Sequence, residues 1–206
     1  MRYLGIMSVG LILVISAGCE NVTQGPAISE KEQFEQKQSP TAKKEEAAQP
    51  AVVTPRKPHK ETPEQAKKKL EELGIEYSEK VFFDNAKNGK ADVVELFLAA
   101  GMSPNVKDGQ TWSPLMHAAE KGHVEVVQVL IDGGADVNQT DRPGNTALTW
   151  AAGEGQVAVV KLLLANGAEV NAKNESGKGP IAQAILYGRD EVVDILLQAG
   201  AEDPRR

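Results

Sequence analysis

The sequence is short of cysteine, of aromatic residues and of any excess of positive charge. Its 206 residues include one cysteine, and aromatic residues make up 4% of the chain. A single cysteine excludes an internal disulfide and a cysteine-based metal site. The net charge of −6 argues against a nucleic-acid partner, because phosphate recognition needs a basic surface. Apolar residues still make up 41%, so we expect a modest core of small side chains.

The sequence also lacks an apolar run long enough to cross a membrane. Its longest run, LGIMSVGLILVIS, spans residues 4–16, whereas a spanning helix needs ~20 residues. The run follows a short positive start at Met1-Arg2-Tyr3. A positive start and a short apolar run are typical of a secretion signal.

The end of this run resembles a bacterial lipoprotein signal. Ser16-Ala17-Gly18-Cys19 places small residues before a cysteine, which in that family becomes the lipid-bearing first residue. The resemblance implies a signal peptide over 1–18 and lipidation of Cys19. Ser16 departs from the family's usual Leu, and an ordinary signal peptide with an incidental cysteine is the alternative. The resemblance implies attachment to the outer leaflet of a plasma membrane or to the periplasmic side of an outer membrane. Glu20 stands where the family's inner-membrane proteins have Asp, which favours the outer membrane facing the periplasm.

Two further segments precede the main part of the chain. Residues 19–61 are rich in Lys, Glu, Gln, Pro and Ala and poor in aromatic residues, which predicts a disordered linker. Residues 62–77 predict an N-terminal capping helix, because Thr62-Pro63-Glu64-Gln65 has the pattern of a capping box. Its apolar edge is expected at Leu70 and Leu73, and Gly74 is expected to end it.

A period of 33 residues dominates the rest of the chain. Four independent sets of residues keep this step: Gly89, Gly122, Gly155 and Gly188; Gly101, Gly134, Gly167 and Gly200; Asn105, Asn138 and Asn171; and Ser113 and Thr146. A period of this size indicates stacked supersecondary units, none of which buries its apolar face alone. The Ser and Thr positions predict helix starts, and the glycines predict turns and helix ends.

The repeats resemble ankyrin repeats. The segments SPLMHAA at 113–119 and TALTWAA at 146–152 are similar to the family's T-P-L-H-x-A motif, and GHVEVV at 122–127 to its second half. The first and last units lack this motif, as terminal units do. The resemblance implies an all-α solenoid of about four helix-turn-helix units with short β-hairpin-like loops, at about 78–107, 108–140, 141–173 and 174–206.

A search for catalytic residues finds no plausible set. His59 lies in the linker, and His123 occupies a family position that is normally structural. His117 has no second His, Cys or spaced carboxylate to complete a metal site, and Ser113 is better explained as a helix cap. We therefore expect neither an enzyme nor a cofactor or metal site.

Binding residues follow from the resemblance. Members of the family usually hold a partner with the hairpin tips and the concave face of the first helices. This implies partner-binding roles for Gln110, Thr111, Trp112, Arg142, Asn145, Trp150, Lys178 and Tyr187. Trp112 is the strongest candidate, because aromatic residues dominate binding hot spots. The alternative is that Trp112 packs on its own hairpin.

A polar stripe adds a second hypothesis. Four residues 33 apart stand where the family most often has Leu: Asp84, His117, Trp150 and Gln183. They either fill a partly exposed position or form a groove that exchanges hydrogen bonds with a partner.

The sequence thus predicts a non-catalytic, monomeric protein-binding module anchored to the cell envelope. Its partners would be an envelope protein and, through Cys19, the membrane. A scaffold or adaptor is the leading interpretation. An inhibitor or immunity protein that blocks an envelope-acting enzyme or toxin is the alternative. A third hypothesis is a purely structural tether or an enzyme accessory. Affinity separates the first two, because inhibitors tend towards nanomolar binding.

Overall fold

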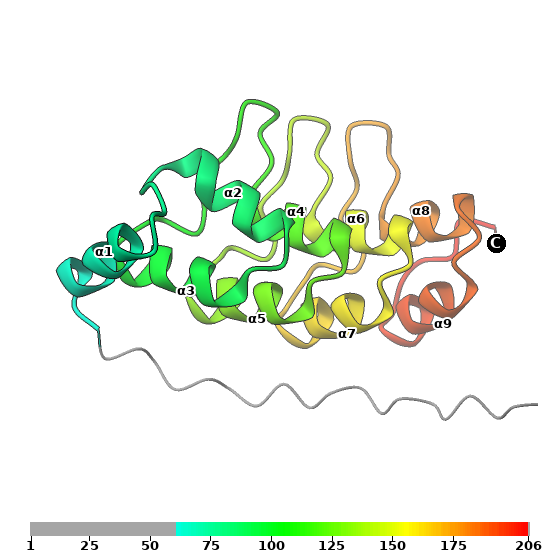
Figure 1. The fold of residues 1–206 in the computed structure, drawn as a ribbon. Helices are drawn as coiled ribbons and strands as arrows, with labels where there is room; N and C mark the ends of the chain where they lie inside the picture. The colour runs from blue at the N-terminus through cyan, green and yellow to red at the C-terminus, as the bar shows by residue number, and fades with distance from the viewer. Residues whose placement is uncertain (1–60, 206) are drawn as a thin grey trace, which may run out of the picture. The chain divides into compact units, whose positions relative to one another are not determined.

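The computed structural model describes residues 61–205 (Figure 1). The signal peptide, the lipidation of Cys19 and the linker up to residue 60 lie outside the described residues and stay predictions. Residues 61–205 belong to one compact unit, and the apolar core found in it runs from Ala66 to Leu196.

Helices arranged in two rows make up the described part, which contains no β-strand. The inner row consists of α2 (Glu79–Lys87), α4 (Pro114–Lys121), α6 (Ala147–Glu154) and α8 (Pro180–Leu186). The outer row consists of α3 (Ala91–Ala99), α5 (Val124–Asp132), α7 (Val157–Ala165) and α9 (Asp190–Gln198). Each inner helix packs on the outer helix that follows it, and three loops project beside the inner row (Figure 1). The predicted all-α repeat architecture is confirmed.

Side-chain caps start the helices where the sequence places them. The hydroxyls of Ser78, Ser113 and Thr146 accept hydrogen bonds from backbone N–H groups three residues later. These bonds satisfy donors that have no partner within a helix. The last inner helix, α8, begins instead at Gly179, without a side-chain cap but with a proline in its first turn.

Helix α1 (Pro63–Glu72) packs against α3 at the end of the outer row. It has the predicted capping box at Thr62 and Gln65. The predicted apolar edge is only half right, since Leu70 is buried but Leu73 is 57% exposed. The helix ends before Leu73, and Ala66, one turn before Leu70, supplies the second buried contact.

The core between the rows consists mainly of Ala, Val and Leu, with Phe82 and Phe97 as its buried aromatic residues. Small side chains let neighbouring inner helices approach closely and fill the narrow space at close packing density. This agrees with the expectation of a core of small residues. Tyr77 covers the first unit by stacking on Phe97 with a centroid distance of 5.5 Å.

Asparagine side chains join each repeat to the next. Asn138 donates from Nδ2 to the carbonyl of Gly167 at 3.1 Å and accepts the N–H of Glu169 at 2.9 Å. The same pair of bonds recurs one period away in each direction, at Asn105 and Asn171. Each amide therefore satisfies one donor and one acceptor of the neighbouring backbone, which fixes the register of the stack.

A second set of bonds runs in the opposite direction along the chain. A ring nitrogen of His123, Nε2, lies 2.9 Å from the carbonyl oxygen of Lys87. One and two periods later, Gln156 donates to the carbonyl of Glu120 at 3.1 Å and Arg189 to that of Gly153 at 3.0 Å. These three residues, which we call the clamp residues, bond carbonyls at the C-terminal ends of the preceding inner helices. His123 thus has the structural role expected of it.

A glycine lies in close contact with the side chain of the clamp residue Gln156. Gly122 has φ +77°, and a Cβ atom there would overlap the amide of Gln156. Gly188 has a similar φ of +66°, but no atom lies within 4 Å of the place where its Cβ would be. Both glycines have a left-handed backbone, but a clamp side chain contacts Gly122 and none contacts Gly188.

We predict that Gly122→Ala destabilises the fold more than Gly188→Ala. Both substitutions place a Cβ in the left-handed region, which costs about 1–2 kcal/mol. Gly122→Ala also displaces the Gln156 amide, which adds about 1 kcal/mol for the lost hydrogen bond. Urea unfolding of fragment 47–206 measures both free energies. Equal losses would show that the clamp contributes nothing to stability.

Candidate functional site

The three projecting loops span residues 108–112, 141–145 and 174–178. In the first loop, the N–H of Asp108 donates to the carbonyl of Trp112 at 3.0 Å, and the N–H of Thr111 donates to the carbonyl of Asp108 at 2.9 Å. The same two bonds close the other loops one and two periods later. Each loop is therefore a tight turn, and the hairpin-like shape forms without an extended ladder. We call the surface shared by these loops and the inner helices the inner face.

A carboxylate or amide at the start of each loop holds the turn from inside. Asp108 Oδ1 accepts the N–H groups of Gln110 and Trp112 at 2.8 and 2.9 Å. Asp141 Oδ1 accepts the N–H of Asn145 at 2.7 Å, and Asn174 has the same role in the last loop. A short side-chain acceptor is needed here because the turn leaves these N–H groups without backbone partners.

The polar stripe ties two of the loops to the inner helices. Nε2 of His117 lies 2.9 Å from Oδ2 of Asp108, and Nε1 of Trp150 donates to Oδ2 of Asp141 at 3.1 Å. The stripe residue and its carboxylate are nine positions apart in both repeats. Nε2 of His117 and Nε1 of Trp150 are therefore used within the repeats, a role that neither hypothesis for the stripe included. Nδ1 of His117 is buried and has no hydrogen-bond partner among residues 61–205.

The ends of the stripe differ from its middle. Asp84, in the first repeat, is exposed. Gln183, in the last, is half-buried, and its loop begins with Asn174 in place of an aspartate. The tie between loop and helix thus combines an aspartate with a nitrogen donor in the two middle repeats.

Hydrogen bonding sets the pKa of Asp108. Burial of the Asp108 carboxyl raises its pKa. Hydrogen bonds from the N–H groups of Trp112 and Gln110 and from His117 together lower the pKa by more, so it lies below the ordinary 3.8. The stabilisation from the ionised carboxylate is therefore complete above the unfolded value and is lost as the pH falls through the folded one. The first loop keeps its internal bonds throughout the neutral range.

Aromatic rings form a continuous row across three repeats. Phe83 meets the ring of His117 at a centroid distance of 5.9 Å, and His117 meets Trp112 at 5.1 Å. Trp112 in turn lies 4.3 Å from Trp150 of the next repeat. Trp112 is half-buried in this row, so its ring packs between its own repeat and the following one.

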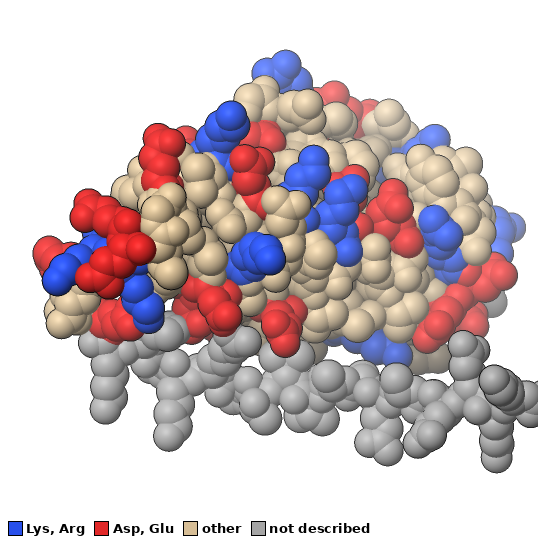
Figure 2. Space-filling view, in the orientation of Figure 1, with Lys and Arg blue, Asp and Glu red and all other residues tan. Residues whose placement is uncertain are grey.

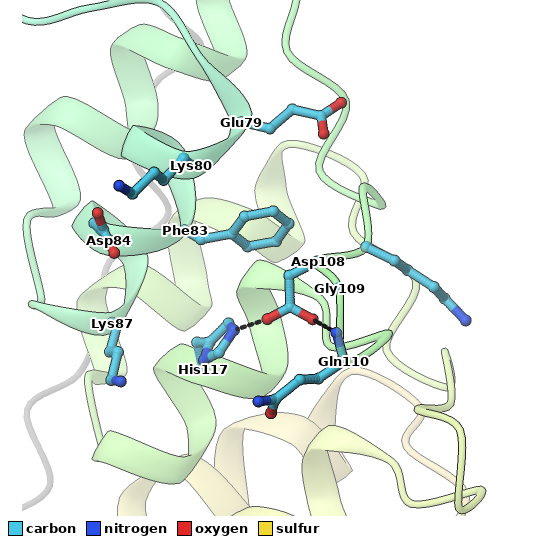
Figure 3. A pocket seen from close by; sticks show the side chains of 10 residues that line it. Glu79, Lys80, Phe83, Asp84, Lys87, Asp108, Gly109, Gln110 and His117 are labelled. Carbon is cyan, nitrogen blue, oxygen red and sulfur yellow. Dashed lines mark hydrogen bonds and ion pairs between the residues drawn. The ribbon is translucent and has the colours of Figure 1, made fainter.

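A pocket of about 650 Å³ opens beside this row, between α2 and the first loop (Figure 3). Phe83 points into it, and Asp108 reaches from the loop to His117 on α4. Its rim carries charges of both signs, from Glu79 and Asp84 and from Lys80, Lys87 and Lys107.

The structure separates the predicted partner-binding residues by exposure. Gln110, Arg142 and Lys178 are exposed on the three loops, and Tyr187 is 58% exposed at the end of α8. Trp112 and Trp150 lie together and are half-buried.

Asn145 differs from the expectation of an open tip residue, because it is 7% exposed. Its Oδ1 accepts the Nδ2 of Asn174 at 2.7 Å, and its own Nδ2 donates to Asp141. Burial between two loops therefore gives Asn145 the role of joining them, and we leave it out of the binding surface.

Thr111 has a strained backbone. Its φ is +66°, whereas the equivalent positions one and two periods later are Gly144 and Gly177, with φ of +85° and +71°. The Thr111 hydroxyl oxygen is buried and has no hydrogen-bond partner among residues 61–205. A β-branched residue in this region of backbone space is unusual, because its Cβ crowds the following carbonyl.

We predict that Thr111→Gly stabilises the fold by about 0.5–1 kcal/mol. The substitution removes the left-handed strain and the unpaired hydroxyl, and the greater entropy of the unfolded glycine chain offsets part of the gain. The control is Thr140→Gly, an exposed threonine outside the left-handed region, which should be neutral or destabilising. Thermal unfolding of fragment 47–206 measures both, and a lower midpoint for Thr111→Gly would contradict the prediction.

Sequence reasoning did not identify the side-chain acceptors that hold the loops. Asp108, Asp141 and Asn174 keep the 33-residue period, and this signal was present in the sequence. No periodic pattern in the sequence indicates the role of Phe83, because its place in the aromatic row depends on how α2 packs beside α4.

Comparison with known proteins agrees with this geometry. A family model described as ankyrin repeats, in three copies, matches residues 82–174 and 143–206. A comparison with curated proteins gives no match. The two matched stretches cover more than half of the chain and include the inner and outer helices of all four repeats from Phe82 onward. The chain belongs to the ankyrin-repeat family.

Proposed function

We propose that this chain is a non-catalytic adaptor that holds a protein partner at the cell envelope. Ankyrin repeats are in general modules that bind other proteins without catalysis. The observation that carries the proposal is that exposed loop residues lie on a scaffold whose repeats and loops are fixed by hydrogen bonds. Gln110, Arg142 and Lys178 stand free on loops that are closed by their own hydrogen bonds. A partner therefore meets a surface that loses little conformational entropy on binding.

The proposed attachment to the envelope rests on the N-terminal sequence. The 13-residue apolar run and the small residues before Cys19 support a lipid anchor, and Glu20 favours an outer membrane as its location. Among residues 61–205, no helix is both long and apolar enough to span a bilayer. The residues between Cys19 and α1 would separate the repeats from the membrane and give them reach.

We predict that reversing two loop charges abolishes capture of a partner. Fragment 47–206 serves as bait for envelope extract, beside the variant Arg142→Glu/Lys178→Glu. The control variant Lys90→Glu/Lys161→Glu makes the same change of charge at two exposed lysines away from the loops. A protein retained by the unaltered fragment and the control, but lost by the loop variant, is the expected result.

Retention of the same proteins by all three baits would remove the loops from the proposed binding surface. Where a partner is captured, its affinity separates the two roles. A nanomolar dissociation constant that accompanies loss of the partner's activity would favour the inhibitor, and weaker binding without such loss would favour the adaptor.

We predict that Cys19→Ser releases the full chain from the membrane fraction. The serine hydroxyl does not accept the thioether-linked lipid, so labelled fatty acid should appear in the unaltered chain and be absent from the variant. The readout is fractionation with labelled palmitate. A label that persists in the variant would contradict lipidation at Cys19. If the unaltered chain is itself unlabelled and secreted, the ordinary signal peptide is supported instead.

A further inference from the structure

We propose that Leu186 and Tyr187 form a docking site for a basic, apolar-containing segment of a protein partner. In this site an apolar side chain of the partner covers the pair, and Lys or Arg side chains of the partner face the surrounding carboxylates. The inference rests on the proposed function, since it names the chemistry of the segment that the repeats hold.

The two side chains are exposed at positions where the other repeats are polar or small. Leu186 is 60% exposed and Tyr187 is 58% exposed. The residues one period earlier are Gly153 and Glu154, and two periods earlier they are Glu120 and Lys121. The inner helices of those repeats form without an apolar residue at either position. Folding therefore does not require Leu-Tyr at the end of α8.

Tyr187 is held in place by the preceding repeat. A Cβ added to the buried Gly153 would lie 3.5 Å from Tyr187 Cδ2, which is ordinary van der Waals contact. The ring thus rests on the small surface that the glycine leaves. Arg189, two residues later, donates from Nε to the carbonyl of Gly153 at 3.0 Å and fixes the turn that follows. An aromatic side chain ordered before binding makes an efficient anchor, because little rotamer entropy remains to be lost.

The charges on the helices next to the pair are mostly acidic. Helices α6, α8 and α9 contain no Lys or Arg, and their acidic residues are Glu154, Asp190, Glu191 and Asp194. Two bases lie among these acids: Arg189 donates to the carbonyl of Gly153, and Arg205 pairs with Asp203 and also interacts with Asp190. Figure 2 shows acidic side chains at the α9 end of this face, with Lys or Arg side chains beside them. An apolar pair in an acidic surrounding favours a basic partner and repels anionic ones.

The same charge argues against other occupants. An anionic lipid surface or a nucleic acid would bring negative charge towards these carboxylates. A second copy of the chain would bring a repeat domain that is itself acidic, with 22 acids and 15 bases over residues 63–206. A Lys- or Arg-bearing polypeptide segment is the occupant whose charge complements the site.

The test uses two fluorescein-labelled peptides. One alternates Lys with Leu (the Lys peptide), and the other alternates Glu with Leu (the Glu peptide). Fluorescence anisotropy of each peptide is measured against fragment 47–206 at physiological salt. We expect the Lys peptide to bind and the Glu peptide not to bind. Leu186→Glu/Tyr187→Glu should weaken binding of the Lys peptide about tenfold or more, the loss expected for removal of a hot spot.

This double substitution discriminates between anchoring and simple charge attraction. Glu occupies the equivalent of 186 in the second repeat (Glu120) and the equivalent of 187 in the third (Glu154), so the fold should tolerate it. It adds two negative charges, which would strengthen a purely electrostatic association. Binding that is unchanged or tighter in this variant would therefore overturn the proposal.

Leu73→Glu is the matched control. Leu73 is 57% exposed on the opposite end of the stack, so its replacement changes charge and apolar exposure by a similar amount per residue. It should leave binding of the Lys peptide unchanged. Glu154→Gln/Asp190→Asn should weaken binding several-fold, with the difference diminishing at high salt. Loss of binding in the Leu73 variant, or no effect of the carboxylate variant, would also overturn the proposal.

The outcome can be separated from that of the proposed function. If the envelope partner is lost with Arg142→Glu/Lys178→Glu but is retained by Leu186→Glu/Tyr187→Glu, the adaptor function stands and this docking site fails. If both variants release the partner, the loops and the end of α8 belong to one binding surface. Circular dichroism melts of each variant show that the repeats remain folded.

Discussion

Hydrogen bonds from side chains to the backbone of a neighbouring repeat hold the stack together. A helical pair with a core of Ala, Val and Leu has little shape of its own to specify how it meets the next pair. The clamp residues and the asparagines at 105, 138 and 171 supply that specification, because each bonds a carbonyl or N–H at a fixed place in the adjoining repeat. The inner face, its loops and the aromatic row all depend on the resulting register.

The loops illustrate how the same frame accepts variation. Each begins with a side-chain acceptor, and two of them are tied to an inner helix through an aspartate and a nitrogen nine residues later. Within these limits equivalent exposed positions differ from loop to loop, as at Gln110, Pro143 and Ser176. Thr111 shows the limit of the tolerance, since it occupies a backbone conformation that its counterparts reach with glycine. Surface identity can therefore change from repeat to repeat without altering the scaffold.

Much of the fold could be predicted from the sequence, because its signals are local or periodic. The capping box at Thr62, the hydroxyl cap at Ser113 and the 33-residue spacing of Gly122 with Gly155 each follow from short-range geometry. The candidate site was less accessible to this reasoning. Asn145 reads as a tip residue along the chain, yet it is buried because the next loop lies against it. Trp112 meets Trp150 only because two repeats stack, so its half-buried state depends on packing that no local pattern encodes.

The last repeat has a neighbour on one side only within the described residues. Helix α8 packs on α6 and on its own partner α9, and no helix follows α9 among residues 61–205. In a linear array, the terminal unit has the fewest interfaces and opens before the middle ones. A protein seated on α8 would take the place of the missing neighbour. Binding of a partner to α8 would then raise the melting temperature of the repeats and slow amide exchange in α8 and α9, because the bound end of the array opens less often.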